Sequence, residues 1–165
     1  MKKVNIEESI KKRHPEGVAL IVCRDKKKTS VTPIGWFMLC NSDPRCWAIS
    51  LYHKHYSHKV ISETKEFVLC LPSCSQKKDI LYCGNVHGWN VDKLKNCNLK
   101  TIPSKKVKPP IIENSIACFE CKVIKTCNLK DHTIFIGEIL TSYISDRKDK
   151  VYNLGERKLI EWKLE

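Results

Sequence analysis

The sequence predicts a mainly β protein, a barrel of short strands with short peripheral helices. Three observations support this fold class. Short apolar or alternating segments follow one another at close spacing, only a few segments have helical character, and only six of the 165 residues are glycine. Closely spaced short strands are typical of barrels and sandwiches. At this length we expect one domain over residues 1–165, with a core that needs neither a disulfide nor a metal to form.

The expected strands differ in their patterns. Residues 18–23 form a continuous apolar run, typical of a strand buried on both faces. Residues 117–123 place Ala, Phe, Cys and Val at alternate positions against Cys, Glu and Lys, which predicts a half-exposed strand. The full set of expected strands is 18–23, 30–39, 46–52, 67–71, 117–123 and 133–144.

Helices are expected at residues 5–13, 56–64 and 75–83. The first ends at His14 because a residue that precedes proline avoids the helical conformation. A further helical turn is expected at 92–97. The Lys- and Pro-rich residues 103–110 are expected to form a surface loop.

The chain is strongly basic, with 30 basic and 18 acidic residues and a formal charge of +12. Such an excess suits nucleic acid, an anionic surface or a phosphorylated ligand. The basic residues are mostly scattered lysines, typical of a solvated surface, and only five are arginine. A protein that reads phosphate or guanine in bidentate fashion is usually richer in arginine. A nucleic-acid-binding barrel is therefore a less favoured alternative.

Ten cysteines raise the question of disulfides or zinc. The N-terminus has no apolar signal segment and no apolar run is long enough to cross a membrane, so we expect a cytoplasmic protein with reduced thiols and no membrane partner. Cys118 and Cys121 have zinc-like spacing, but residues three apart on a strand point to opposite faces. We predict no metal site and mostly buried thiols, with a redox thiol near the functional site left open.

Four ordered segments form a signature. They are 55–57 followed by 66–72, then 88–94, 119–123 and 131–138, which read His-Tyr-Ser with Glu-Phe-Val-Leu-Cys-Leu-Pro, Gly-Trp-Asn-Val-Asp-Lys-Leu, Phe-Glu-Cys-Lys-Val and Asp-His-Thr-Ile-Phe-Ile-Gly-Glu. In this order and at these spacings they resemble the flavin reductase and flavoredoxin family. The resemblance implies a split β-barrel of Greek-key type that binds FMN. It also implies a homodimer with the flavin near the subunit interface, for which Trp47 and apolar positions in 139–144 are candidate contacts.

A site for FMN needs hydroxyls and cations at a helix N-terminus for the phosphate, and an apolar wall for the ring. Ser57 suits the phosphate by its place near a helix start, although serine there is as often a plain N-cap. The resemblance assigns flavin contacts to Trp36, Ser57, Lys93 and His132. The asparagine of the family falls at Ser30, and its threonine falls at Pro33, where Thr32 can supply a hydroxyl instead. The predicted flavin-binding residues are Ser30, Thr32, Trp36, His55, Ser57, Lys93 and His132.

The resemblance further implies an NAD(P)H:flavin reductase, in which hydride passes to flavin N5 and electrons then pass to a small-molecule or protein acceptor. No catalytic side chain is predicted. No Gly-x-Gly-x-x-Gly follows a strand, so a nicotinamide would have to dock directly on the flavin. The alternative within the family is a flavoredoxin-type electron carrier that does not use NAD(P)H.

Overall fold

The computed structural model describes residues 1–163 of the chain. Its main element is a seven-stranded sheet in which every neighbouring pair is antiparallel. The strands are β2 (Ala19–Arg24), β3 (Thr29–Ile34), β4 (Phe37–Ser42), β5 (Arg45–Tyr52), β6 (Glu66–Leu71), β9 (Ala117–Asn128) and β10 (His132–Ile144). Their order across the sheet is β3-β2-β6-β9-β10-β5-β4.

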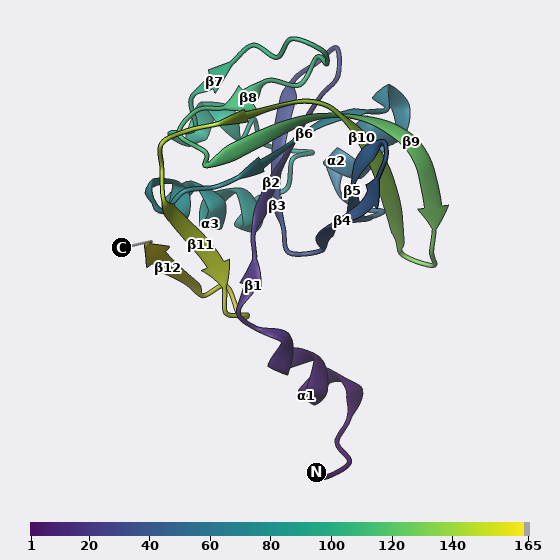
Figure 1. Cartoon of the computed structure of the whole chain (residues 1–165), viewed down its shortest axis with the longest axis vertical. Helices are drawn as coiled ribbons and strands as arrows, with labels where there is room; N and C mark the ends of the chain where they lie inside the picture. The colour runs from purple at the N-terminus through teal and green to yellow at the C-terminus, as the bar shows by residue number, and fades with distance from the viewer. Residues whose placement is uncertain (164–165) are drawn as a thin grey trace.

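The two edge strands of this sheet, β3 and β4, are consecutive in the sequence and are joined only by Gly35 and Trp36. The sheet must therefore curl until its edges come close, yet no ladder joins them, which gives a split barrel (Figure 1). The predicted fold class is confirmed. The single strand predicted over 30–39 is wrong, because the chain turns a corner at Gly35. A Cβ at Gly35 would lie 2.8 Å from Cδ of Glu16, so a larger residue at this corner would require the Glu16 carboxylate to move.

Helices and short strands lie around the sheet, except α1, which extends away from it toward the N-terminus (Figure 1). The helical elements are α1 (Ile6–Ile10), η1 (Lys11–Arg13), α2 (Tyr56–Thr64), η2 (Cys74–Gln76), α3 (Lys77–Asn85) and η3 (Leu94–Asn96). They confirm the predicted helical regions, including the end at His14. The remaining strands are β1 (Glu16–Gly17), β7 (Thr101–Ile102), β8 (Ile111–Ile112), β11 (Asp149–Asn153) and β12 (Leu159–Lys163). Sequence patterning did not predict the β11–β12 hairpin, which is charged and pairs through β11 with the two-residue strand β1.

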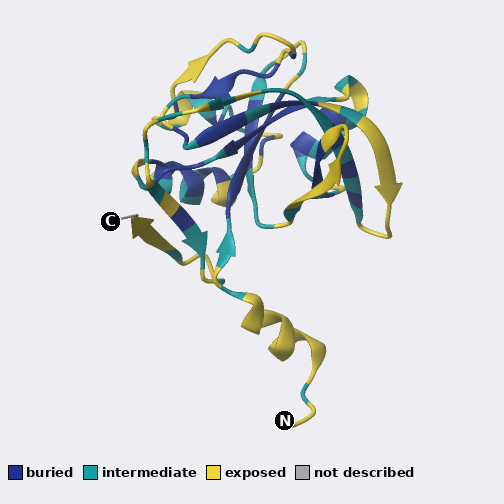
Figure 2. Cartoon of the chain, viewed as in Figure 1, coloured by how far each residue is buried: buried dark blue, intermediate teal, exposed yellow. Residues whose placement is uncertain are grey.

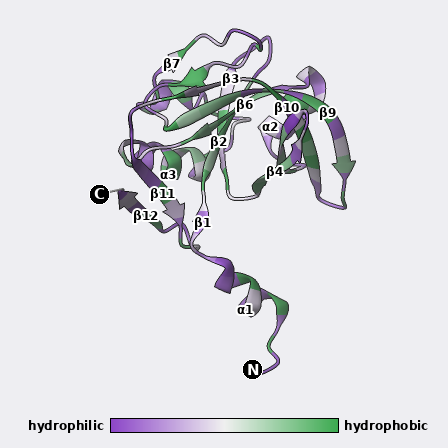
Figure 3. Cartoon of the chain, in the orientation of Figure 1, coloured by the Kyte–Doolittle hydropathy of each residue, from purple (hydrophilic) through white to green (hydrophobic). Residues whose placement is uncertain are grey.

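Both faces of the central strands are buried (Figure 2). Along β2, Leu20 and Val22 join one apolar cluster with α3 and β8, whereas Ala19 and Ile21 join a second cluster with α2. The continuous apolar run predicted to be a doubly buried strand is confirmed. Hydrophobic residues concentrate accordingly in central strands such as β2 and β6 (Figure 3).

The half-exposed strand predicted at 117–123 is wrong in two respects. The strand continues to Asn128, and Cys118 and Glu120 on its supposedly exposed face are buried. The reason is the loop over residues 103–110, which covers that face. Both carboxylate oxygens of Glu120 accept hydrogen bonds from backbone N–H groups of this loop. A period-2 pattern cannot reveal what packs over a sheet.

The cysteines do not form disulfides, and six of them, Cys23, Cys46, Cys70, Cys83, Cys118 and Cys121, are buried. The prediction that most thiols act as buried apolar groups is confirmed. Between residues 1 and 163, no helix is both long enough and apolar enough to cross a membrane.

Candidate functional site

The first turn of α2 is the centre of the site. His55 is the N-cap residue, but its side chain does not cap the helix. Ser57 is 1% exposed, and its hydroxyl has no hydrogen-bond partner among residues 1–163. The backbone N–H groups at a helix start attract anions, because they lack intrahelical partners and lie at the positive end of the helix dipole.

Three buried polar atoms at this place lack hydrogen-bond partners in the described part of the chain. They are Oγ of Ser57, Nδ1 of His55 and Oγ of Ser30, which lies on β3. Leaving such a group unpaired costs about 1–3 kcal/mol, and native structures have few of them. Their concentration at one helix end indicates a place built to receive a polar ligand.

A small cavity of about 80 Å³ opens beside the helix start. Its lining includes Thr32 of β3, His55 and Tyr56 at the start of α2, Cys83 of α3, and Lys93. Three of the seven predicted residues, Thr32, His55 and Lys93, therefore meet at one cavity. Sites for whole organic cofactors usually measure about 300–1,000 Å³. This cavity has room for a phosphate-sized group, and a larger ligand would extend over its rim.

Gly88 holds the loop between α3 and η3 against the helix start. A Cβ at Gly88 would lie 2.9 Å from Oγ of Ser30 and 3.1 Å from Cβ of Tyr56. A larger residue at Gly88 would require the Ser30 hydroxyl and the Tyr56 side chain to move. The Nζ of Lys28 donates a hydrogen bond to the carbonyl of Gly88 and lies 4.6 Å from the centroid of the Tyr56 ring, which fixes the loop from the other side.

Lys93 brings a buried positive charge to the cavity. The residue is 4% exposed, and its Nζ donates a 2.6 Å hydrogen bond to the carbonyl of Cys83. It makes no ion pair with any residue between 1 and 163. Burial lowers the pKa of Lys93, and burial together with the Lys93 charge lowers the pKa of His55. A buried cation without an acidic partner is destabilising unless an anion pairs with it.

Trp36 and His132 lie together outside the cavity. Their ring centroids are 5.0 Å apart, and His132 is 5.3 Å from Tyr52, which is in turn 5.7 Å from His55. The rings thus extend from the cavity to Trp36, which is 49% exposed. Nδ1 of His132 lies 2.9 Å from Oδ1 of Asp131. A partly exposed row of rings of this kind provides a wall for a flat aromatic ligand.

Comparison with known proteins identifies the family. The family model described as "Flavin reductase like domain" matches residues 11–160. The chain belongs to the flavin reductase-like domain family. An uncharacterized protein of Archaeoglobus fulgidus is 34% identical over 114 residues, which are 69% of this chain and 64% of that protein. The chain thus spans less than two thirds of this relative.

Solved structures of the family share the fold. An FMN-binding protein from Thermus thermophilus superposes with a TM-score of 0.86 at 16% identity, covering 98% of this chain and 94% of that one. Flavoredoxin from Methanosarcina acetivorans gives 0.86 at 23%, covering 100% and 91%. The NADH:FAD oxidoreductase SgcE6 from Streptomyces globisporus gives 0.83 at 16%, covering 100% and 98%. At these identities the likeness concerns the fold.

The residues of this flavin reductase-like domain fit a phosphorylated ligand with a ring system. Oγ of Ser57, Nδ1 of His55, the Lys93 ammonium and the N–H groups of α2 all suit a phosphate. The unpartnered hydroxyl of Ser30 lies beside them, although the serine side chain is shorter than the asparagine of the family pattern. Trp36 and His132 offer the ring wall.

Sequence reasoning missed several residues at this site. Tyr52 connects the ring row to the cavity, and Tyr56 and Trp89 pack edge-to-face 5.0 Å apart at the rim. Gly88 and Trp89 belong to the signature segment 88–94, but the sequence did not indicate a function for either residue. Tyr52 had no sequence signal beyond lying at the end of a strand. Its importance comes from the pairing of β5 with β10, which places it opposite His132.

Cys83 lines the cavity beside Thr32, His55 and Lys93. Burial raises its pKa to about 12, with a further contribution from Cys97. A thiol with so high a pKa is protonated near neutral pH and is a poor nucleophile. The raised pKa therefore favours a structural role for Cys83.

Proposed function

We propose that the chain is an FMN-binding redox enzyme that uses NAD(P)H as the electron donor. The observation that carries the proposal is the group of unpartnered buried polar atoms on Ser30, His55 and Ser57 beside the buried ammonium of Lys93. Together these groups suit a phosphate and a polyhydroxyl chain. The neighbours described as FMN-binding protein and as NADH:FAD oxidoreductase support the choice of a flavin.

The proposed site residues form two groups, one for the phosphate end of FMN and one for its ring. Ser57, His55 and Lys93 hold the phosphate end, with Thr32 and Ser30 next to the ribityl chain. Trp36 and His132 hold the ring at the barrel split and leave one face open to a second substrate. When bound, FMN supplies reversible two-electron chemistry through N5. The protein then needs no side chain as acid or base, and none is assigned.

The proposal is tested first by binding and then by reduction. FMN titrated into purified protein should quench flavin fluorescence with one equivalent per chain. A protein that neither carries flavin nor binds added FMN would rule the proposal out. Anaerobic addition of NADH or NADPH should then bleach the flavin absorbance.

A flavoredoxin-type carrier is the second candidate, and the structural likeness to the M. acetivorans flavoredoxin over the whole chain favours it. In that case neither NADH nor NADPH bleaches the flavin, whereas a reduced protein donor does. The same anaerobic experiment therefore separates the two.

We also propose a homodimer that brings the β4 edge against a second copy. Met38 and Leu39 of β4 are 63% and 53% exposed and continue the apolar surface from Trp36. Trp47, a candidate contact from the sequence, is instead buried between Phe37 and Phe119, so its packing lies within one chain. Light scattering should give twice the chain mass. A monomer at micromolar concentration would contradict this.

A further inference from the structure

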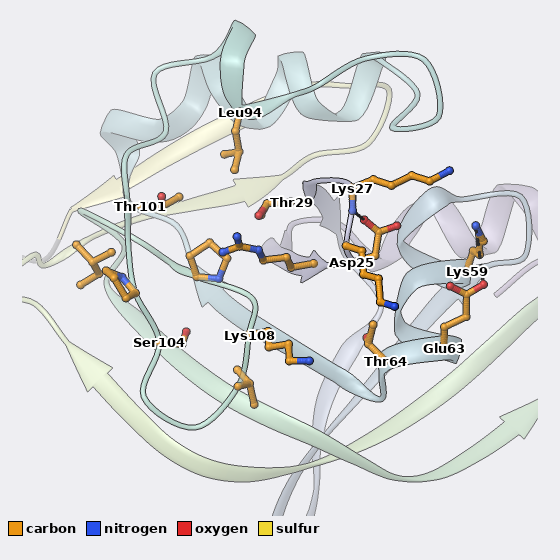
Figure 4. Close-up of a pocket in the computed structure, with 16 residues that line it drawn as sticks. Asp25, Lys27, Thr29, Lys59, Glu63, Thr64, Leu94, Thr101, Ser104 and Lys108 are labelled. Atoms are coloured by element: carbon orange, nitrogen blue, oxygen red, sulfur yellow. Dashed lines mark hydrogen bonds and ion pairs between the residues drawn. The ribbon is translucent and has the colours of Figure 1, made fainter.

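A second concave surface lies on the other side of the turn after β2. It is a groove of about 1040 Å³ formed by four segments, namely the turn and the start of β3 (24–29), the part of α2 from Lys59 onward, Leu94 of η3 and the loop over 101–110 (Figure 4). None of the seven predicted flavin residues lines it.

The walls of this groove are held in place without a ligand. In the turn, Oδ1 of Asp25 accepts hydrogen bonds from N–H of Lys27 and Lys28, at 2.8 and 2.9 Å. In the loop, the fully buried Glu120 accepts bonds from N–H of Lys105, Lys106 and Val107, at 2.9, 2.6 and 3.1 Å. A loop without regular secondary structure is thus fixed by a buried carboxylate. Preformed walls lower the entropic cost of binding.

The groove has unbalanced positive charge. Arg24, Lys26, Lys27 and Lys108 line it and make no ion pair with residues of the described chain. The two acids of the lining, Asp25 and Glu63, offset only part of this charge, because the lining has five basic residues when Lys59 is included. Glu63 lies 3.8 Å from Lys59 in an exposed ion pair.

The rest of the lining is of two kinds. Hydroxyl groups suited to phosphate oxygens come from the walls, and an apolar surface comes from η3 and the loop. The hydroxyl residues are Thr29, Thr64, Thr101 and Ser104. Those of Thr64 and Ser104 already donate to the carbonyls of Val60 and Pro109, so Thr29 and Thr101 are the donors suited to a phosphate. The apolar residues include Leu94, Ile102 and Val107. Cations and hydroxyls beside an apolar surface suit an anion with an apolar body.

We infer that this groove is a second ligand site that binds an organic phosphate of nucleotide size, with its phosphates on Arg24, Lys27 and Lys108 and its base on the apolar surface. Its volume is that of a small-molecule site rather than of a flat protein interface. The inference does not rest on the proposed function, because the two sites share no predicted residue. They adjoin through Tyr56, which lines the cavity and donates a hydrogen bond to Asp25 of the groove.

The test is calorimetric titration of ADP into the protein, with and without added FMN. We expect one saturable site, weakened by added salt because the contacts are charged. The double variant Lys27→Glu/Lys108→Glu reverses charge on two opposite walls and should weaken ADP binding about tenfold or more. The matched control Lys148→Glu/Lys11→Glu changes the same charge at exposed positions away from the groove and should leave ADP binding within about twofold. FMN affinity should not change in either variant.

Several results would overturn the inference. One is the absence of saturable ADP binding up to about 1 mM. A second is a loss of ADP affinity in the control variant equal to that in the groove variant, and a third is displacement of FMN by ADP. A fourth is that inorganic pyrophosphate binds as tightly as ADP. The last would mean that charge alone attracts the anion and that the apolar surface contributes nothing. A titration with NAD⁺ distinguishes two sources of the ligand. If NAD⁺ binds more tightly than ADP only when FMN is present, the natural ligand is a dinucleotide. If NAD⁺ and ADP bind equally, the ligand is a free nucleotide.

Discussion

The hydroxyl of Tyr56 donates a 2.6 Å hydrogen bond to Oδ2 of Asp25, and this bond joins the first turn of α2 to the turn after β2. On one side of it lies the cavity with Lys93, and on the other lies the basic groove. Burial alone would raise the pKa of Asp25, but the bonds from Tyr56 and from the N–H groups of Lys28 and Lys27 outweigh it and lower that pKa.

The Tyr56→Phe variant should therefore be less stable by about 1 kcal/mol at neutral pH. Because the folded-state pKa of Asp25 is lowered, its contribution is present above the unfolded pKa and is lost as pH falls through the folded value. Urea unfolding of both proteins should show the difference at pH 7 and a smaller one under acid conditions. Tyr152→Phe is the control, because its hydroxyl makes no hydrogen bond within residues 1–163. A difference that does not shrink with acidification would contradict the role of Asp25.

Ser57→Ala should weaken FMN binding while leaving the flavin-free protein as stable or slightly more stable. The Ser57 hydroxyl is buried without a partner, so its removal breaks nothing in the protein, whereas a phosphate loses a donor. The expected loss of affinity is about tenfold, measured by flavin fluorescence. Ser73 offers the matched control, since its buried hydroxyl belongs to a capping box at η2. Ser73→Ala should cost about 0.5–2 kcal/mol of stability and leave FMN affinity unchanged. The reverse pattern would remove Ser57 from the site.

The sequence predicted the fold class and the helix start with Ser57, because strand spacing and helix signals are local. It also placed Lys93 and His132 in ordered segments of the signature. The corner at Gly35 and the burial of Glu120 could not be predicted, since both depend on contacts between distant segments. Glu120 was assigned to the solvent face by the alternation of β9, yet the loop that covers it has no pattern of its own. The basic groove, which depends on that loop, was invisible for the same reason.

Lys93→Met should weaken FMN binding and change the pH dependence of stability. Burial lowers the pKa of Lys93, so between its folded and unfolded pKa values the unfolded chain binds more protons and stability rises with pH. The variant should lack this rise on the alkaline side of neutrality, measured by urea unfolding across that range. FMN affinity in the wild type should fall over the same range as the ammonium loses its proton. An affinity that is independent of both the substitution and pH would place the phosphate elsewhere.

Glu120→Gln should destabilise the protein and loosen the loop over 103–110. Glu120 accepts three backbone N–H bonds and a 2.6 Å bond from the Tyr143 hydroxyl, and these bonds outweigh burial and lower its pKa. Replacing the carboxylate leaves buried donors unpaired, at a cost of about 1.5–3 kcal/mol. Because the pKa is lowered, this loss should be full at neutral pH and should diminish as acid protonates the wild-type carboxyl. Hydrogen exchange of the Lys105, Lys106 and Val107 amides gives the local readout, with exposed Glu8→Gln as control. Unchanged protection of these three amides would show that the loop, and with it one wall of the groove, is held by something other than Glu120.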